Sequence, residues 1–304
     1  MRENLAMVFA PQQRASFDLA AHFGSQVVGA LIDEVTLAPK PGLVDIRSQG
    51  AHHDLDWKLM CQSALALEPC FVELARAGIE TRALPELRER IGAIGRDGEA
   101  RMMDATHGVN THRGAIWALG LLVTAAAREP HDLAADAIAA RAGEIARIAD
   151  RHAPLQTGNK GEQACIDYNV GGARGQAQAG FPHVVQVALP ELVRSRQRGD
   201  SETAARLNAL LAVMASLDDT CVLARGGRRA LAELQSGARR VLAQGGAAAL
   251  SGRRHLKALD RRLIELHVSP GGAADLLAAT LFLDRLQADA AASKEPNTTH
   301  TQES

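Results

Sequence analysis

The sequence predicts a single all-α domain built from many helices. Aromatic residues make up only 3% of the 304-residue chain, whereas hydrophobic residues make up 46%. Because strands draw on aromatic and β-branched residues, this composition favours helices. Apolar residues recur at helical spacing, and no run of alternating residues indicates a strand. We expect residues 17–290 to form this domain, between a flexible arm of residues 1–16 and a disordered polar tail of residues 291–304.

The helices can be placed in order. The first is predicted over residues 17–35, because apolar residues recur every four positions there and Pro39 ends the pattern. Asp54 is placed to cap the next helix, which Pro69 should break. Further helical patterns cover residues 84–103, 112–128, 132–152, 181–194, 202–223, 228–237 and 256–267, and a last helix follows Ser269-Pro270.

Composition also excludes several classes of function. The net charge of −1 provides no basic field to attract nucleic acid. The longest apolar run, residues 115–127, is shorter than the ~20 residues that cross a bilayer, so it predicts a buried helix and no membrane anchor. The four cysteines form no CxxC pair and no signal peptide is present, so we expect reduced thiols in a cytoplasmic protein.

The first candidate site lies in two polar loops. One contains Lys40 between two prolines, and the other carries His52, Asp54 and Asp56. Clustered carboxylates suit Mg²⁺, which keeps several waters and bridges substrate phosphates. The alternative is that an aspartate merely caps the following helix. Such specified loops are more often functional than structural, and they suggest a site for an anionic, metal-bound substrate.

Four further strings place acids, arginines and glycines at helix ends. Asp218-Asp219-Thr220 precedes Arg225-Gly226-Gly227, where a metal ligand would stand near a phosphate-binding arginine or, alternatively, the acids would lie at a solvated helix end. His112 and Arg113 open the apolar helix, where backbone N–H groups can bind phosphate. The remaining candidates are Arg174, in a glycine-rich turn, and Gly271, Gly272 and Asp275, after Ser269-Pro270.

Taken in order, these strings resemble the triphosphoribosyl-dephospho-CoA synthase family from roughly Ala20 to Asp284. The match runs through Pro-Lys-Pro-Gly at 39–42, Gly-Ala-His-x-Asp-x-Asp at 50–56 and Gly-Val-Asn-Thr-His-Arg-Gly at 108–114. It continues with Gly-Ala-Arg-Gly at 172–175, Asp219 with Arg225-Gly-Gly, and Ser-Pro-Gly-Gly-x-Ala-Asp at 269–275. Residues 161–168 match the pattern less closely.

The resemblance implies an activity. Members of this family transfer the triphosphoribosyl group of ATP to the 2′-hydroxyl of 3′-dephospho-CoA and release adenine. The product is the prosthetic-group precursor for the acyl-carrier subunit of malonate decarboxylase or citrate lyase, and a separate transferase attaches it. We favour the malonate decarboxylase version. The α-linked product implies inversion by one displacement, which agrees with the absence of a nucleophile motif.

Residue roles follow from this chemistry. Cleaving the ribose–adenine bond builds oxocarbenium character, so the site needs negative charge, a base for the hydroxyl and cations for the triphosphate. We expect Asp54, Asp56, His52 and His112 to be catalytic, with a histidine assisting proton transfer to adenine. The expected Mg²⁺ ligands are Asp54, Asp56, Asp219 and Asp275, and the expected ATP-binding residues are Lys40, Arg113, Arg174, Arg225, Gly271 and Gly272.

Two other readings compete with this one. One is a metal-dependent all-α hydrolase of a phosphate ester or ADP-ribose, because His53-Asp54 and Asp218-Asp219-Thr220 are similar to motifs of such enzymes. Such a hydrolase would turn over with water alone. A non-enzymatic helical scaffold would bind no nucleotide and leaves the polar loops unexplained. A homo-oligomer is compatible with either enzyme.

Overall fold

Helices account for the regular structure of the described chain. The computed structural model describes residues 11–154 and 158–292, with side chains described from residue 18. Within these ranges no strand occurs. The predicted all-α fold is therefore confirmed.

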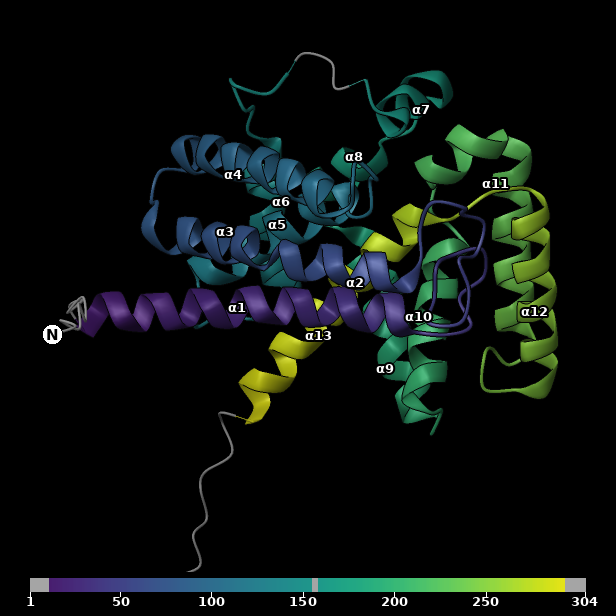
Figure 1. The fold of residues 1–304 in the computed structure, drawn as a ribbon. Coiled ribbons are helices and arrows are strands. Elements are labelled where there is room, and N and C mark those ends of the chain that lie inside the picture. The colour runs from purple at the N-terminus through teal and green to yellow at the C-terminus, as the bar shows by residue number, and fades with distance from the viewer. Residues whose placement is uncertain (1–10, 155–157, 293–304) are drawn as a thin grey trace, which may run out of the picture.

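Figure 1 shows the order of the helices. Their bounds are α1 Pro11–Thr36, α2 Trp57–Ala66, α3 Glu68–Glu80, α4 Leu84–Ala105, α5 Arg113–Arg128, α6 Ala135–Arg147, α7 Lys160–Tyr168, α8 Gly172–Gln178, the π-helix η1 His183–Ala188, α9 Leu189–Gln197, α10 Glu202–Met214, α11 Thr220–Ala243, α12 Leu250–Glu265 and α13 Gly271–Ala292. Helix α11 is kinked at Gly227, whose φ of 64° is easily adopted only by glycine.

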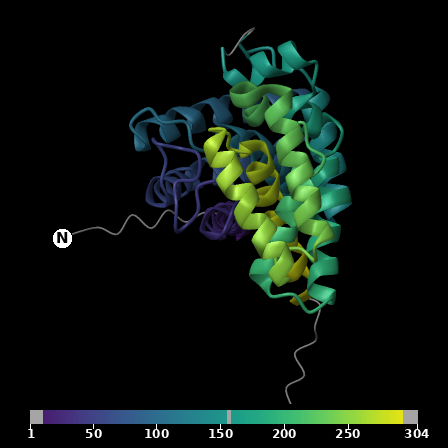
Figure 2. The same ribbon diagram turned by 90° about the vertical axis from the view of Figure 1, so that its right-hand side faces the viewer.

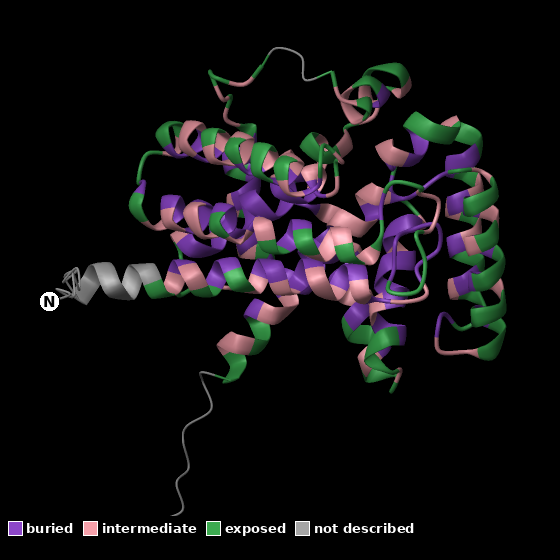
Figure 3. Ribbon diagram, viewed as in Figure 1, coloured by how far each residue is buried: buried purple, intermediate pink, exposed green. Residues whose placement is uncertain are grey.

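The predicted apolar helix, α5, forms the centre of the domain. Every residue from Ala115 to Ala127 except Trp117 is buried, and α3, α6 and α13 pack around it. Figure 3 shows this buried interior surrounded by exposed outer faces. Each fully buried leucine or valine contributes about 1.5–3 kcal/mol. One hydrophobic core takes residues from α1 through α13, so these helices form a single domain.

The loop between α1 and α2, residues 37–56, lies against the antiparallel pair formed by α11 and α12. Figures 1 and 2 show this loop beside the pair. The backbone N–H of Gly42 donates to Asp260 of α12 at 2.9 Å. A Cβ on Gly42 would lie 2.8 Å from the side chain of Leu263, so only glycine permits this approach. The fold thereby brings two distant stretches of the sequence together.

Some predicted boundaries require correction. Helix α1 begins at Pro11 instead of Phe17. The helix predicted over residues 202–223 ends at Met214, and a new helix begins at Thr220. Helices α7 and α8 were not predicted, because they are short and α8 carries glycines that disfavour helix.

The caps and ends differ in part as well. Asp56, not Asp54, caps α2, and its Oδ1 accepts the N–H of Leu59 at 2.8 Å. The predicted break at Pro69 is confirmed, because α2 ends at Ala66 and α3 begins at Glu68. The predicted tail begins in helix, since α13 continues to Ala292, and its remainder lies outside the described residues, as do residues 1–10 of the predicted arm.

No helix in the described ranges is both long enough and apolar enough to cross a membrane.

Candidate active site

Lys40 occupies a buried position at the end of α1. Only 2% of the residue is exposed, and its Nζ donates to Glu34 Oε1. Its backbone N–H donates to Asp45 Oδ2 at 3.1 Å, and Asp45 Oδ1 accepts the N–H groups of Arg47 and Ser48. The double-proline loop therefore supports a buried ion pair. The sequence had suggested that Lys40 presents an open ammonium group to a phosphate, but in the structure that group is paired with Glu34.

His112 lies beside this pair, immediately before α5. Its Nδ1 is 2.8 Å from Ser63 Oγ, and its Nε2 is buried without a hydrogen-bond partner. Burial, followed by the positive charge of Lys40, lowers the pKa of His112 to about 4. The imidazole is therefore neutral near pH 7, which does not suit the expected proton donation to adenine.

Asp219 joins the starts of two helices. Its Oδ1 accepts the N–H of Cys221 at 2.9 Å, which caps α11, and its Oδ2 accepts the N–H of Ala273 in α13 at 2.9 Å. Gly272 makes the approach possible, since a Cβ there would lie 3.1 Å from Asp219 Oδ2. Burial raises the pKa of Asp219 despite these bonds. Both carboxylate oxygens are thus already occupied by backbone donors.

Asp275 lies one turn into α13, against the start of α5. A Cβ on Gly114 would be only 2.0 Å from Asp275 Oδ2, so the carboxyl group rests directly on the α5 backbone. Burial raises the pKa of Asp275 well above its ordinary value, and the charges of Glu34 and Asp219 raise it further. Asp275 is nevertheless only partly covered, so it can face a ligand.

These contacts define one buried centre, composed of Glu34, Lys40, His112, Asp219 and Asp275. The centre contains three carboxyl groups and one lysine, which pairs with Glu34. If all of them ionised, the centre would carry an excess of buried negative charge, which is strongly unfavourable. Asp275 has two acidic neighbours, Glu34 and Asp219, which add to the effect of burial in raising its pKa and so favour its protonated form.

A second group, the loop rim, consists of His52, Asp54 and Arg225. His52 Nδ1 lies 3.5 Å from Asp54 Oδ1, and its Nε2 lies 3.4 Å from Arg225 Nη1. Burial and then the charge of Arg225 lower the pKa of His52. The Asp54 side chain is 67% exposed. The structure thus brings the predicted strings at 50–56 and 219–227 together through His52.

The glycine-rich turn is also joined to the acidic string. A cavity of about 110 Å³ lies between them and is lined by Gly171, Gly172, Gly175, Gln176, His183, Ser216, Leu217 and Asp218. Gly172 has a φ of +55°, and a Cβ there would lie 3.3 Å from Thr220 Cγ2. Sequence reasoning missed Gln176 and His183, whose side chains lie 3.1 Å apart. Arg174 is exposed beside this turn, whereas Arg113 is paired with Glu99 at 3.0 Å.

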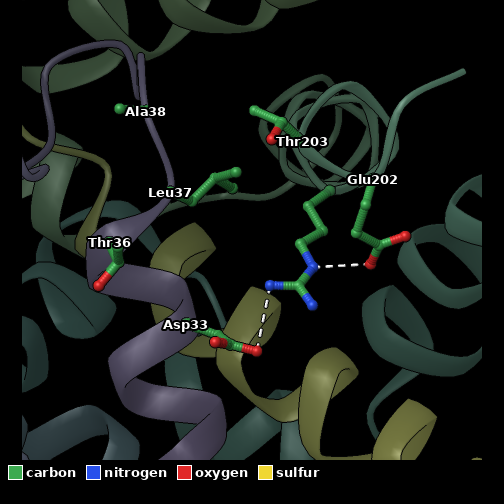
Figure 4. Close-up of a pocket in the computed structure, with 7 residues that line it drawn as sticks. Asp33, Thr36, Leu37, Ala38, Glu202 and Thr203 are labelled. Carbon is green, nitrogen blue, oxygen red and sulfur yellow. Dashed lines mark hydrogen bonds and ion pairs between the residues drawn. The ribbon is translucent and has the colours of Figure 1, made fainter.

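A larger cavity, of about 260 Å³, lies away from the predicted strings between the end of α1 and the start of α10. Figure 4 shows Asp33, Glu202 and Thr203 around it. Arg206 bonds to Asp33 at 3.1 Å and to Glu202 at 2.7 Å, so the charged groups of this cavity already satisfy one another. It therefore offers a weaker candidate site than the buried centre.

The expected magnesium ligands do not form a ready-made metal site. Among the described residues, no three histidine, cysteine or acidic side chains converge in a way that could hold a metal ion. Asp56 caps a helix, Asp219 is bonded to backbone N–H groups, and Asp275 lies beside Glu34. Asp54, Asp56, Asp219 and Asp275 are therefore not assembled as one ligand set.

The fold and the site define an all-helical protein with a protonatable buried centre and an arginine-bearing rim suited to an anionic substrate. Comparison with known proteins identifies it more closely. The family described as ATP:dephospho-CoA triphosphoribosyl transferase matches residues 20–294. The chain belongs to this family and is a transferase enzyme.

Similar proteins agree. A protein of Azotobacter vinelandii named probable 2-(5''-triphosphoribosyl)-3'-dephosphocoenzyme-A synthase is 57% identical over 273 residues, covering 88% of this chain and 92% of the relative. Proteins with the same name from Pseudomonas aeruginosa UCBPP-PA14 and Pseudomonas fluorescens Pf0-1 are 57% and 55% identical, covering 89% and 91% of this chain and 92% and 96% of the relatives. No solved structure matches the chain.

Proposed function

We propose that this enzyme transfers the triphosphoribosyl group of ATP to the 2′-hydroxyl of 3′-dephospho-CoA and releases adenine. Family membership supports the two substrates. The observation that carries the proposal is the position of Asp275 against the start of α5, where burial and two acidic neighbours favour its protonated form, because a departing adenine needs a proton. The product would be the prosthetic-group precursor for the acyl-carrier subunit of malonate decarboxylase, or of citrate lyase, and would pass to a separate transferase.

The reaction needs one acid and one base. The C1′–N9 bond of ATP breaks while the 2′-hydroxyl oxygen bonds to C1′, so the hydroxyl loses a proton and adenine gains one. A catalytic acid and base can be recognised where the surroundings raise the pKa of one group and lower the pKa of the other. Burial and neighbouring acids raise the pKa of Asp275, whereas burial and Arg225 lower that of His52. We assign Asp275 as the acid and His52 as the base.

Asp54 and Arg225 would prepare His52 for this role. Asp54 lies next to Nδ1 and favours the tautomer with its proton there, which leaves the lone pair on Nε2. In the structure, Arg225 occupies the space beside Nε2. A substrate phosphate that draws Arg225 away would free the base. Substrate binding and activation of the base would then be coupled.

Glycine and arginine residues would bind the remainder of ATP. Gly271 and Gly272 are half-buried at the start of α13, with Cys221 and Asp219 packed beside them, and Arg174 is an exposed cation beside the glycine-rich turn. We propose that Mg²⁺ enters with the triphosphate, since Mg²⁺ commonly binds through few protein ligands and the substrate phosphates. A cytoplasmic location and a homo-oligomeric state also remain proposals.

The test is adenine release from ATP and Mg²⁺, measured with and without 3′-dephospho-CoA by chromatography and mass spectrometry. We expect adenine together with a triphosphoribosylated dephospho-CoA, and only when the acceptor is present. Equal release without the acceptor would instead indicate the metal-dependent hydrolase. Gene neighbourhood would distinguish the malonate decarboxylase system from the citrate lyase system.

A further inference from the structure

A cluster of three arginines joins the exposed Arg174 to two residues not described so far. Arg88 and Arg96 project from the same face of α4, and Arg174 approaches them from α8. The acidic group recorded beside Arg88 is Asp150, 3.7 Å from its Nη1, and Arg96 binds the same carboxylate at 2.7 Å. Two arginines thus share one carboxylate, and Arg174 adds a third positive charge near Arg88. We call Arg88, Arg96 and Arg174 the arginine cluster.

Arg88 is the unusual member, because a guanidinium group is rarely buried without full compensation. Only 6% of the residue is exposed, and its Nε has no hydrogen-bond partner. Its guanidinium lies over the ring of Trp117 at 5.3 Å, a contact that favours a cation there. Burial lowers the pKa of Arg88, and the charges of Arg174 and Arg96 oppose the attraction of Asp150. The cluster therefore lacks negative charge.

Contacts connect the arginine cluster to the proposed active site. Trp117 Nε1 donates to the carbonyl of Ala173, the residue before Arg174, at 3.3 Å. Trp117 also lies three residues after Gly114, on which Asp275 rests, and residues three apart are neighbours on a helix surface. The arginine cluster and the proposed acid therefore contact α5 at positions about one turn apart.

We propose that the arginine cluster binds phosphate groups of a nucleotide substrate. Arginine's planar fork matches phosphate oxygens, and a phosphate would supply the negative charge that Asp150 alone does not. The bound group is either the triphosphate of ATP or the diphosphate of 3′-dephospho-CoA, and both present the same oxygens. The inference deepens the proposed function and rests on it for the identity of the substrate. Arg88 and Arg96 extend the expected role of Arg174.

Direct binding tests the cluster without requiring turnover. Inorganic triphosphate and inorganic diphosphate would be titrated calorimetrically into the full-length protein and into R88Q, R96Q and R174Q. Each loss of a charge-assisted hydrogen bond should weaken binding about tenfold or more. R101Q is the matched control, because Arg101 lies on the same helix in an exposed pair with Glu73. Unchanged affinity in all three cluster variants would overturn the proposal.

Folding must be separated from binding, since Arg88 is buried. Circular dichroism and thermal unfolding would identify a variant that fails to fold, and exposed Arg174 provides a substitution that leaves the interior intact. Conservative R88K should keep the charge and lose the fork, so that it binds more weakly than the unmodified protein and more tightly than R88Q. Equal binding by R88K and R88Q in folded proteins would contradict a phosphate contact at Arg88.

Kinetics distinguish the two phosphate sources. A rise in KM for ATP alone in R174Q and R88Q would assign the cluster to the triphosphate, and a rise for 3′-dephospho-CoA alone would assign it to the diphosphate. If the unmodified enzyme transfers triphosphoribosyl groups but neither KM changes, the cluster proposal fails and the proposed function stands. If the unmodified enzyme binds inorganic triphosphate through the cluster but makes no product, the proposed function fails instead.

Discussion

The loop rim and the buried centre contain the same kinds of residues under opposite conditions. In the rim, the Asp54 side chain is mostly open to solvent beside His52. In the centre, Asp275 lies against the backbone of α5, with Glu34 and Asp219 as acidic neighbours. Because burial penalises the charged form of both groups, it raises the pKa of the Asp275 carboxyl and lowers the pKa of the His52 imidazole. The same effect therefore favours an acid in the centre and a base in the rim, roles that residue identity alone leaves unassigned.

The largest expected effect comes from removing the proposed acid. Asp275→Asn should lower kcat by about 10²–10⁴, the usual contribution of general acid–base catalysis, while the protein remains folded. The measurement is steady-state adenine release, and Asp54→Asn is the comparison from the rim, with an expected loss of about tenfold. Full activity in Asp275→Asn would show that the centre does not supply the proton.

The same substitution should change how stability depends on pH. The folded-state pKa of Asp275 is raised above its unfolded value, so its contribution to stability is fully present at low pH and is lost as pH rises through the folded-state pKa. Asparagine does not titrate. Thermal unfolding should therefore show that the stability of Asp275→Asn, relative to that of the unmodified protein, increases with pH. A difference that is constant with pH would contradict the raised pKa.

The next effect concerns the ion pair beneath Asp275. Lys40→Met leaves Glu34 buried without its partner, which should cost about 3–5 kcal/mol in the free energy of unfolding. Urea denaturation measures this cost. The double variant E34L/K40M should recover much of it, since no charge then remains buried.

An exposed pair supplies the control for that experiment. Arg90 binds Glu80 at 2.7 Å with both side chains partly exposed to solvent, so Arg90→Met should cost less than about 1 kcal/mol. Equal costs for Lys40→Met and Arg90→Met would show that burial does not distinguish the two pairs.

Adjacent aspartates provide a smaller and more local contrast. Asp219→Ala removes the acceptor for N–H groups in both α11 and α13 and should cost about 2 kcal/mol in the free energy of unfolding. Asp218→Ala should stay within about 0.5 kcal/mol, because Asp218 is exposed. Denaturation of both variants, with adenine release as a second readout, makes the comparison. The bridging role would be wrong if both changes cost the same.

The fold was predictable because helical periodicity is a local property. The sequence located the buried helix α5 and the break at Pro69, whereas α7 and α8 are short and escaped detection. The fold class also follows from composition, since few aromatic residues were present to build strands.

The site was predictable only in part, because protonation and pairing depend on contacts between distant segments. The sequence motifs identified Lys40 and Asp219 as candidates. They did not predict that Lys40 pairs with Glu34 or that Asp219 joins two helix starts. Arg88 and Arg96 carried a local signal, since they lie eight residues apart, about two turns, on one face of α4. Their function could not be inferred without Arg174 and Trp117 beside them.

The smallest effect separates two aspartates that the sequence could not tell apart. Asp56→Ala should cost about 1 kcal/mol of stability, because it removes the cap of α2, and should leave kcat nearly unchanged. Asp54→Ala should leave stability nearly unchanged and lower kcat, since Asp54 caps no helix and lies beside the proposed base. Thermal unfolding and adenine release on the same two proteins measure both quantities. If Asp56→Ala abolished activity at unchanged stability, Asp56 would have the catalytic role that its sequence motif suggested, and the assignment of the rim to His52 and Asp54 would have to be revised.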